Sequence, residues 1–164
     1  MTAKTEKDIE SLIDQGLNPE KSELDLREKE IDDEDLKRIV QSEKIKGVTT
    51  LFLEFNEVGD EGIKALLDAE PMKHLTVLNL FKNKISDEGV KAIARSKTLL
   101  NLSELVLSDN QVGLKGAQAL AESKTLGSLI SLWVGDRLGD EGVRALATSN
   151  TLTRLNLLSL YRNN

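Results

Sequence analysis

The chain has 164 residues, of which 39% are apolar and only 3% aromatic, and its net charge is −6. The acidic balance argues against a nucleic-acid-binding surface, which needs a basic face, and against binding to anionic membranes. Because the sequence holds no cysteine, it excludes disulfides, thiolate metal sites and cysteine nucleophiles.

The chain begins with a charged segment, MTAKTEKDIE, which lacks the apolar core of a signal peptide. No later stretch approaches transmembrane length, so we expect a cytoplasmic protein with no membrane contact. Within residues 5–15, Ile9, Leu12 and Ile13 recur at helical spacing. We therefore predict an N-terminal helical cap over residues 1–20.

Residues 21–164 are organised by a repeat. Six leucines are spaced 27, 27, 27, 27 and 26 residues apart: Leu24, Leu51, Leu78, Leu105, Leu132 and Leu158. Each opens a short run of alternating apolar residues, such as LFLEFNEV and LNLFKNKI, which is typical of a strand with one buried face. A fixed period in the twenties indicates a solenoid. We predict about five full repeats and a final strand, with the fifth repeat one residue short.

A surface helix is predicted between successive strands. Apolar residues recur at i, i+3 and i+4, first at Ile63, Leu66 and Leu67. An aspartate stands before three of these helices, where we expect its carboxylate to cap the helix: Asp60, Asp87 and Asp140. A glycine follows two residues later, which indicates close packing between repeats: Gly62, Gly89, Gly116 and Gly142.

Strand, helix and parallel strand in 27 residues make a right-handed βα unit. The predicted fold is therefore an α/β solenoid, with a concave parallel sheet on the inside of an arc and helices on the convex outside. The first unit has Lys21 where later units carry an apolar residue, so its outer layer is incomplete. The N-terminal helix is expected to cover it.

The phrase LTVLNLFKNKISDEGVKAIARSKTL resembles the ribonuclease-inhibitor subfamily of leucine-rich repeats, in the regular variant with DEG before the helix that is common in bacterial proteins. The resemblance covers roughly residues 21–164. It implies a horseshoe whose concave sheet binds macromolecules, usually proteins. Lys29 and Asp136 replace the usual asparagine, and Leu114 replaces the aspartate before Gly116, so the turns there depart from the pattern.

Two polar rows invite a functional reading but are better explained by structure. The resemblance implies that an inward asparagine satisfies buried backbone groups after each strand, at Asn56, Asn83, Asn110 and Asn163. The Asp–Glu pairs at 60–61, 87–88 and 140–141 suit helix starts better than metal ligands. We therefore predict neither a metal site nor a cofactor.

The candidate binding residues are the outward positions of the strands. All five aromatic residues fall there, with none at the inward strand positions, and exposed aromatic residues are typical of binding surfaces. With the charges beside them, they form the predicted partner-binding set: Phe52, Glu54, Phe55, Phe81, Lys82, Glu104, Asp109, Trp133, Tyr161 and Arg162. We expect a protein partner with some basic character, bound without catalysis.

Little in the sequence favours an enzyme. The one histidine, His74, is expected in a solvated loop, and the solitary glycines make no phosphate-binding loop. Two alternatives stay open. The chain could be the target-recognition domain of a larger protein, such as a secreted bacterial effector acting in a host cytoplasm. Less favoured is a GTPase-activator-like regulator, because such proteins have similar repeats.

The last predicted strand carries Leu155, Leu158 and Leu160 at an uncovered edge of the sheet. An open edge strand can pair with another chain. An end-to-end homodimer through this strand and a longer parent protein are both consistent with the pattern.

Overall fold

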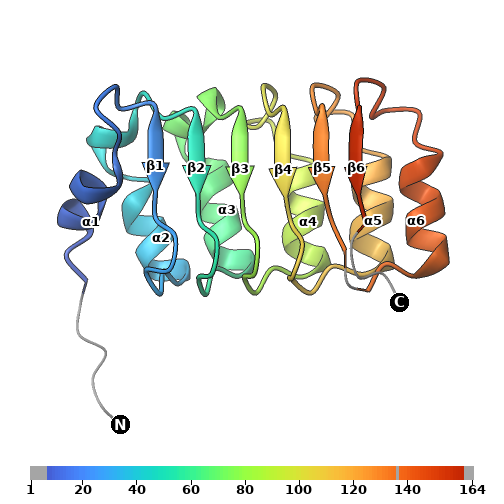
Figure 1. The fold of residues 1–164 in the computed structure, drawn as a ribbon, viewed down its shortest axis with the longest axis horizontal. Coiled ribbons are helices and arrows are strands. Elements are labelled where there is room, and N and C mark those ends of the chain that lie inside the picture. Colours follow the sequence, from blue (N-terminus) through green and yellow to red (C-terminus); the bar gives the residue numbers. More distant parts are fainter. Residues whose placement is uncertain (1–6, 136, 161–164) are drawn as a thin grey trace, which may run out of the picture.

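The computed structural model describes residues 7–135 and 137–160. Six short strands form one parallel sheet in the order β1-β2-β3-β4-β5-β6, as Figure 1 shows. Their bounds are β1 Glu23–Asp25, β2 Thr50–Phe52, β3 Val77–Asn79, β4 Glu104–Val106, β5 Ser131–Trp133 and β6 Leu157–Ser159. The register pairs the repeated leucines with one another from Leu24↔Leu51 to Leu132↔Leu158. The repeated leucines thus lie side by side across the sheet, including those on either side of the shortened fifth unit.

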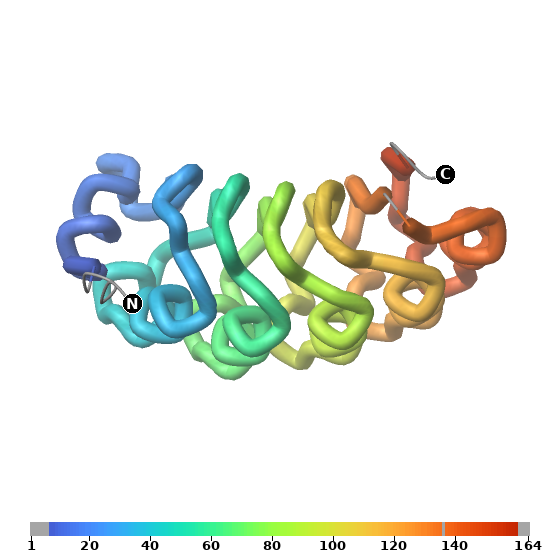
Figure 2. The backbone as a smooth tube through the Cα atoms, turned by 90° about the horizontal axis from the view of Figure 1, so that it is seen from below, coloured from blue at the N-terminus to red at the C-terminus, as the bar shows by residue number. Residues whose placement is uncertain are grey.

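Helices alternate with the strands. The α-helices are α1 Ile9–Gly16, α2 Asp33–Ile39, α3 Asp60–Asp68, α4 Asp87–Ala94, α5 Leu114–Ala121 and α6 Gly139–Ala147, and two 3-10 turns cover Glu43–Ile45 and Glu70–His74. Figure 2 shows helices α2 to α6 along the outer side of a shallow arc and the strands along its inner side. This is the predicted α/β solenoid with a concave sheet. No helix among the described residues is long and apolar enough to cross a membrane.

The core is a stack of thin aliphatic layers. The leucines of strands β1 to β5 are buried, as are a second apolar residue three positions before each of the central ones and apolar residues of every helix, for example Leu78, Leu75 and Ile93. Leu158 of β6 is only partly buried. Each repeat exposes apolar surface unless a neighbour covers it, so the layers stabilise one another along the sheet.

Buried asparagines tie each turn to the repeat before it. Asn83 Oδ1 accepts from the Val58 N–H at 2.9 Å, and its Nδ2 donates to the Leu53 carbonyl at 2.8 Å and the Leu80 carbonyl at 3.2 Å. Asn56 and Asn110 repeat this pattern. The predicted structural role is confirmed for these three, whereas Asn163 lies outside the described residues.

The expectation that the aspartates cap their own helices is wrong. Asp87 is the first residue of α4, and its Oδ1 accepts from the Gly113 and Gly116 N–H groups of the next helix, at 2.7 and 2.9 Å. Asp60 likewise accepts from the Ser86 N–H at 2.9 Å, and Asp33 from the Gly59 N–H at 2.6 Å. The carboxylates thus link neighbouring helices. α6 begins without a side-chain cap. The preceding helix, α5, would supply the carboxylate, but it begins with Leu114 in place of the aspartate.

The helix glycines make room for these links. A Cβ atom at Gly89 would lie 2.4 Å from Asp60 Oδ1, and one at Gly116 would lie 2.7 Å from Asp87 Oδ1. Close packing between repeats is confirmed, and its cause is the carboxylate of the preceding repeat.

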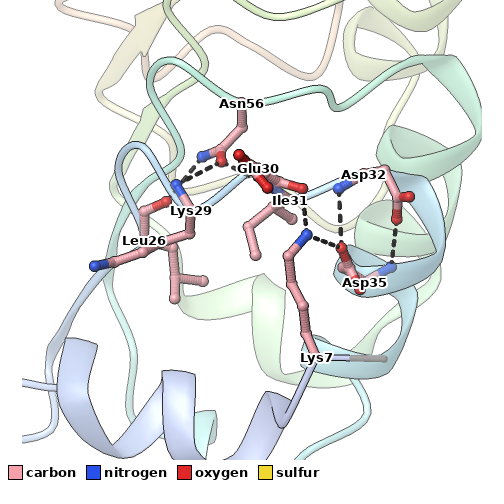
Figure 3. A network of polar contacts seen from close by, with 8 residues as sticks. All are labelled: Lys7, Leu26, Lys29, Glu30, Ile31, Asp32, Asp35 and Asn56. Carbon is pink, nitrogen blue, oxygen red and sulfur yellow. Dashed lines mark hydrogen bonds and ion pairs between the residues drawn. The ribbon is translucent and has the colours of Figure 1, made fainter. Parts of the chain in front are cut away.

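The N-terminal helix α1 packs against the first repeat. Asp8 caps it by accepting from the Ser11 N–H, and Ile9 and Ile13 are buried in the common core. Figure 3 shows Lys7 reaching from the start of α1 into the first turn of the solenoid. Its ammonium donates to Asp35 Oδ2 at 2.7 Å and to the Glu30 carbonyl.

Candidate functional site

The outward positions of the strands form three parallel columns on the concave sheet, followed by a column at its rim. The rim residues share a left-handed backbone, with φ of 57° at Glu28, 57° at Phe55, 53° at Lys82 and 58° at Asp109. Each directly precedes the position of the buried asparagine, which is Lys29 in the first unit. The tight turn that inserts the asparagine therefore also places the rim side chains.

Phe55 of this rim and the half-buried Phe81 of the neighbouring column form an aromatic cluster. The Phe55 and Phe81 rings meet edge to face, with centroids 5.3 Å apart and planes at 75°. The Lys82 ammonium lies 5.0 Å from the Phe55 ring centroid. Phe55 remains 44% exposed, although its ring would gain free energy by burial. A left-handed backbone is also unfavourable for a bulky residue.

Glu54 lies on the same face but differs from the expectation of an exposed flanking charge. It is only 8% exposed. Its Oε1 accepts from Asn79 Nδ2 at 2.8 Å, whereas its Oε2 is buried without a hydrogen bond among the described residues. Burial raises the pKa of the Glu54 carboxyl, and the nearby Arg27 only partly offsets this. The neighbouring repeat contributes to this burial, since Asn79 of β3 bonds to the carboxylate.

Arg27 is engaged by Asp25, a residue of the same repeat. Its guanidinium makes a bidentate ion pair with Asp25, with Nε to Oδ1 at 2.9 Å and Nη2 to Oδ2 at 2.5 Å. The same guanidinium lies 5.4 Å from the Phe52 ring centroid. Both ionised partners are favoured by this contact, which lowers the pKa of Asp25 and raises that of Arg27.

An apolar hollow of about 470 Å³ lies over the C-terminal half of the sheet. It is lined by residues of four neighbouring repeats: Phe81, Val106, Ser108, Trp133, Leu157, Leu158 and Ser159. Trp133 keeps its column despite the shortened repeat, because it pairs in register with Val106 and Ser159. Its ring is half-buried, and its Nε1–H is buried with no acceptor among the described residues.

The remaining predicted residues lie around these two features. Lys82 is exposed, whereas Glu104 and Asp109 are half-buried. Tyr161 and Arg162 lie outside the described residues. Residues 7–160 place six carboxylates and two cations on the concave columns and rim, a balance of four negative charges: Glu23, Asp25, Glu28, Glu54, Glu104 and Asp109 against Arg27 and Lys82.

The prediction missed Val106 and Leu157, which line the hollow, and the pairing of Asn79 with Glu54. All three residues occupy the same outward columns as the predicted ones. Residues of these types are common at outward strand positions, so their type alone does not mark them as part of a binding site. Their part in the site becomes visible only from the side chains that lie beside them across the sheet.

A second hollow, of about 810 Å³, lies away from the sheet between the ends of the first two repeats' helices. Its lining mixes small apolar residues with charged ones, and two of its lysines are already held in ion pairs, Lys46 with Glu43 and Lys73 with Glu70. His74, which also lines it, is exposed. The described residues contain no group of three or more His, Cys, Asp or Glu able to hold a metal ion.

Comparison with known proteins identifies the repeats. No curated protein matches the chain. A family model described as "Leucine Rich repeat" matches residues 48–67, 72–94 and 98–121. The matched segments lie within the second to fourth repeats of the solenoid, and the family they match is that of leucine-rich repeats. Among solved structures, this leucine-rich-repeat solenoid is similar to the LRR ectodomain of the receptor kinase SOBIR1 from Arabidopsis thaliana, at 15% identity and a TM-score of 0.42. That match covers 87% of this chain and 70% of the other.

Proposed function

We propose that this protein binds a protein partner on the concave face of its sheet and has no catalytic activity of its own. Leucine-rich repeats are generally protein-interaction scaffolds. The observation that carries the proposal is the pairing of the aromatic cluster, Phe55 and Phe81, with an apolar hollow at Trp133. Exposed aromatic side chains beside a pocket are where binding energy concentrates.

The scaffold suits binding because it is rigid. Parallel strands fixed by buried leucines and by asparagine hydrogen bonds hold the concave side chains in place. Side chains that are already ordered lose little entropy on association. The negative balance of the face supports a partner surface with basic character.

Several finer assignments are part of the same proposal. The DEG helix starts support the ribonuclease-inhibitor-like subfamily, and we propose a cytoplasmic location. An end-to-end homodimer through β6 is supported by Leu157, which is 41% exposed at the sheet edge. Light scattering over a wide concentration range tests the dimer, which a concentration-independent monomer would exclude. The effector and GTPase-activator alternatives stay predictions from the sequence.

The binding proposal is tested by affinity purification from cells of the source organism. The baits are the wild-type protein, the concave variant Phe81→Ala/Trp133→Ala and the convex control Glu61→Ala/Lys64→Ala, which removes an exposed ion pair on α3. We expect proteins recovered with the wild type and the control to be lost with the concave variant. Equal recovery by all three baits would refute a concave binding face.

A further inference from the structure

Two buried polar atoms on the concave face point to the chemistry of the partner. Among the described residues, Glu54 Oε2 and Trp133 Nε1 are the buried side-chain atoms that lack a hydrogen bond. One is an acceptor and the other a donor. Leaving such groups unpaired is costly, and a ligand that pairs them recovers that cost.

We propose that the concave face binds an extended, basic-apolar segment of a protein, with a lysine or arginine at Glu54 and a large apolar side chain in the hollow at Trp133. This inference rests on the proposed function and specifies its partner. A main-chain carbonyl of the segment accepts the Trp133 Nε1–H.

The Glu54 end of the surface selects a cation. Its carboxylate lies on the concave side, because Glu54 and its donor Asn79 both occupy outward positions of neighbouring repeats. The chain's nearest cation, Arg27, is held by Asp25. Phenylalanine rings beside it already attract cations, since Arg27 lies over Phe52 and Lys82 over Phe55. Those cations already cover the two rings, so a partner cation would meet the carboxylate oxygen that Asn79 leaves unpaired.

The Trp133 end selects an apolar group. The hollow is walled by Phe81, Val106, Trp133 and Leu157, and a volume of about 470 Å³ accommodates a leucine or an aromatic side chain. The negative balance of the surrounding face disfavours an acidic segment.

The separation of the two ends sets the spacing in the partner. Glu54 follows β2 and Trp133 ends β5, three strand intervals away, or about 14 Å across the strands at ~4.8 Å per interval. Glu54 also lies two residues beyond the register of Trp133, an offset of roughly 7 Å that the long side chain of a lysine or arginine can span. An extended chain covers about 13 Å in four residues and presents positions i and i+4 on one side. The expected motif is therefore a lysine or arginine four positions from a leucine, isoleucine, phenylalanine or tryptophan.

The test selects random dodecapeptides displayed on phage against the immobilised full chain. We expect the bound pool to be enriched in the basic-apolar motif. Single fluorescently labelled peptides are then titrated by anisotropy against the wild type, Glu54→Gln, Phe81→Ala and the convex control Glu61→Gln, after circular dichroism shows that each variant folds.

Glu54→Gln keeps an oxygen for Asn79 and removes the charge. It should weaken binding of the selected peptide about tenfold, and the same peptide with methionine in place of lysine should bind both proteins equally. This inference is overturned, and the proposed function stands, in either of two outcomes. In the first, the selected peptides lose affinity with Phe81→Ala but contain no basic residue. In the second, they bind Glu54→Gln as tightly as the wild type. No enriched pool, or binding indifferent to Phe81→Ala, would overturn both.

Discussion

At the scale of single residues, the concave face holds groups that do not serve stability. Glu54 is buried as a carboxylate with one unpaired oxygen, and Phe55 combines an exposed ring with a left-handed backbone. Phe55 packs against Phe81, which also lines the hollow. Unfavourable features that gather at one place on a protein are typical of functional sites.

Glu54→Gln should stabilise the protein at neutral pH by about 1 kcal/mol, because it removes a buried charge and keeps the bond from Asn79. The pKa of Glu54 is raised in the folded state, so the wild type loses stability as pH rises from the unfolded-state pKa through the folded-state pKa. The stability gained from Glu54→Gln should therefore be complete at pH values above the folded-state pKa of Glu54 and absent at pH values well below its unfolded-state pKa. Urea unfolding of both proteins across the acidic range measures it, and a gain that persists at the lowest pH would contradict it.

Asn83→Ala should destabilise the protein by about 2 kcal/mol, because it leaves the buried N–H of Val58 unpaired and removes one of the two amide hydrogen bonds to the Leu53 carbonyl. Asn101→Ala is the matched control, since Asn101 is exposed and donates only to the Lys73 carbonyl. Chemical denaturation of the two variants measures the difference. Equal costs would show that the asparagine row is dispensable.

At the scale of elements, the helices are joined by the carboxylate of one and the first turn of the next. The bond from Gly113 to Asp87 spans 26 residues, one less than the repeat, so each link crosses a repeat boundary. Each link also needs a glycine in the first turn of the next helix, because a Cβ atom there would clash with the carboxylate. The aspartates and the glycines therefore act together.

Asp87→Ala should cost about 1–2 kcal/mol, because α5 loses the acceptor for two N–H groups at its start. Asp140→Ala changes the equivalent residue of α6, whose side chain is exposed, and should cost little. Thermal unfolding of both variants provides the comparison. A larger loss for Asp140→Ala would mean that the aspartates cap their own helices after all.

At the scale of the whole molecule, stability is passed from neighbour to neighbour along the arc. The first repeat depends on α1, through Ile13 in the core and through Lys7, which bonds to Asp35 (Figure 3). In such a stack, the loss of a terminal layer weakens the nearest repeats first.

Ile13→Ala should destabilise the protein by about 2–4 kcal/mol, because it leaves a cavity between α1 and the first repeat. Hydrogen exchange should show protection lost in α1, β1 and α2 before β4 and β5. Uniform loss across all strands would instead indicate that the solenoid unfolds as a single unit.

Most of this fold could be predicted from the repeat in the sequence. Each type of residue recurs at the same position of every unit, and equivalent positions have the same surroundings because each unit packs against similar units. Leucine spacing set the strand register, and the aromatic residues marked the concave face. The tertiary structure decided what depends on neighbours in the next repeat. It buried Glu54 between strands, directed Asp87 to the following helix, and assembled the hollow from residues of four repeats. Contacts across 26 or more residues arise only when the repeats stack, so local sequence cannot reveal them.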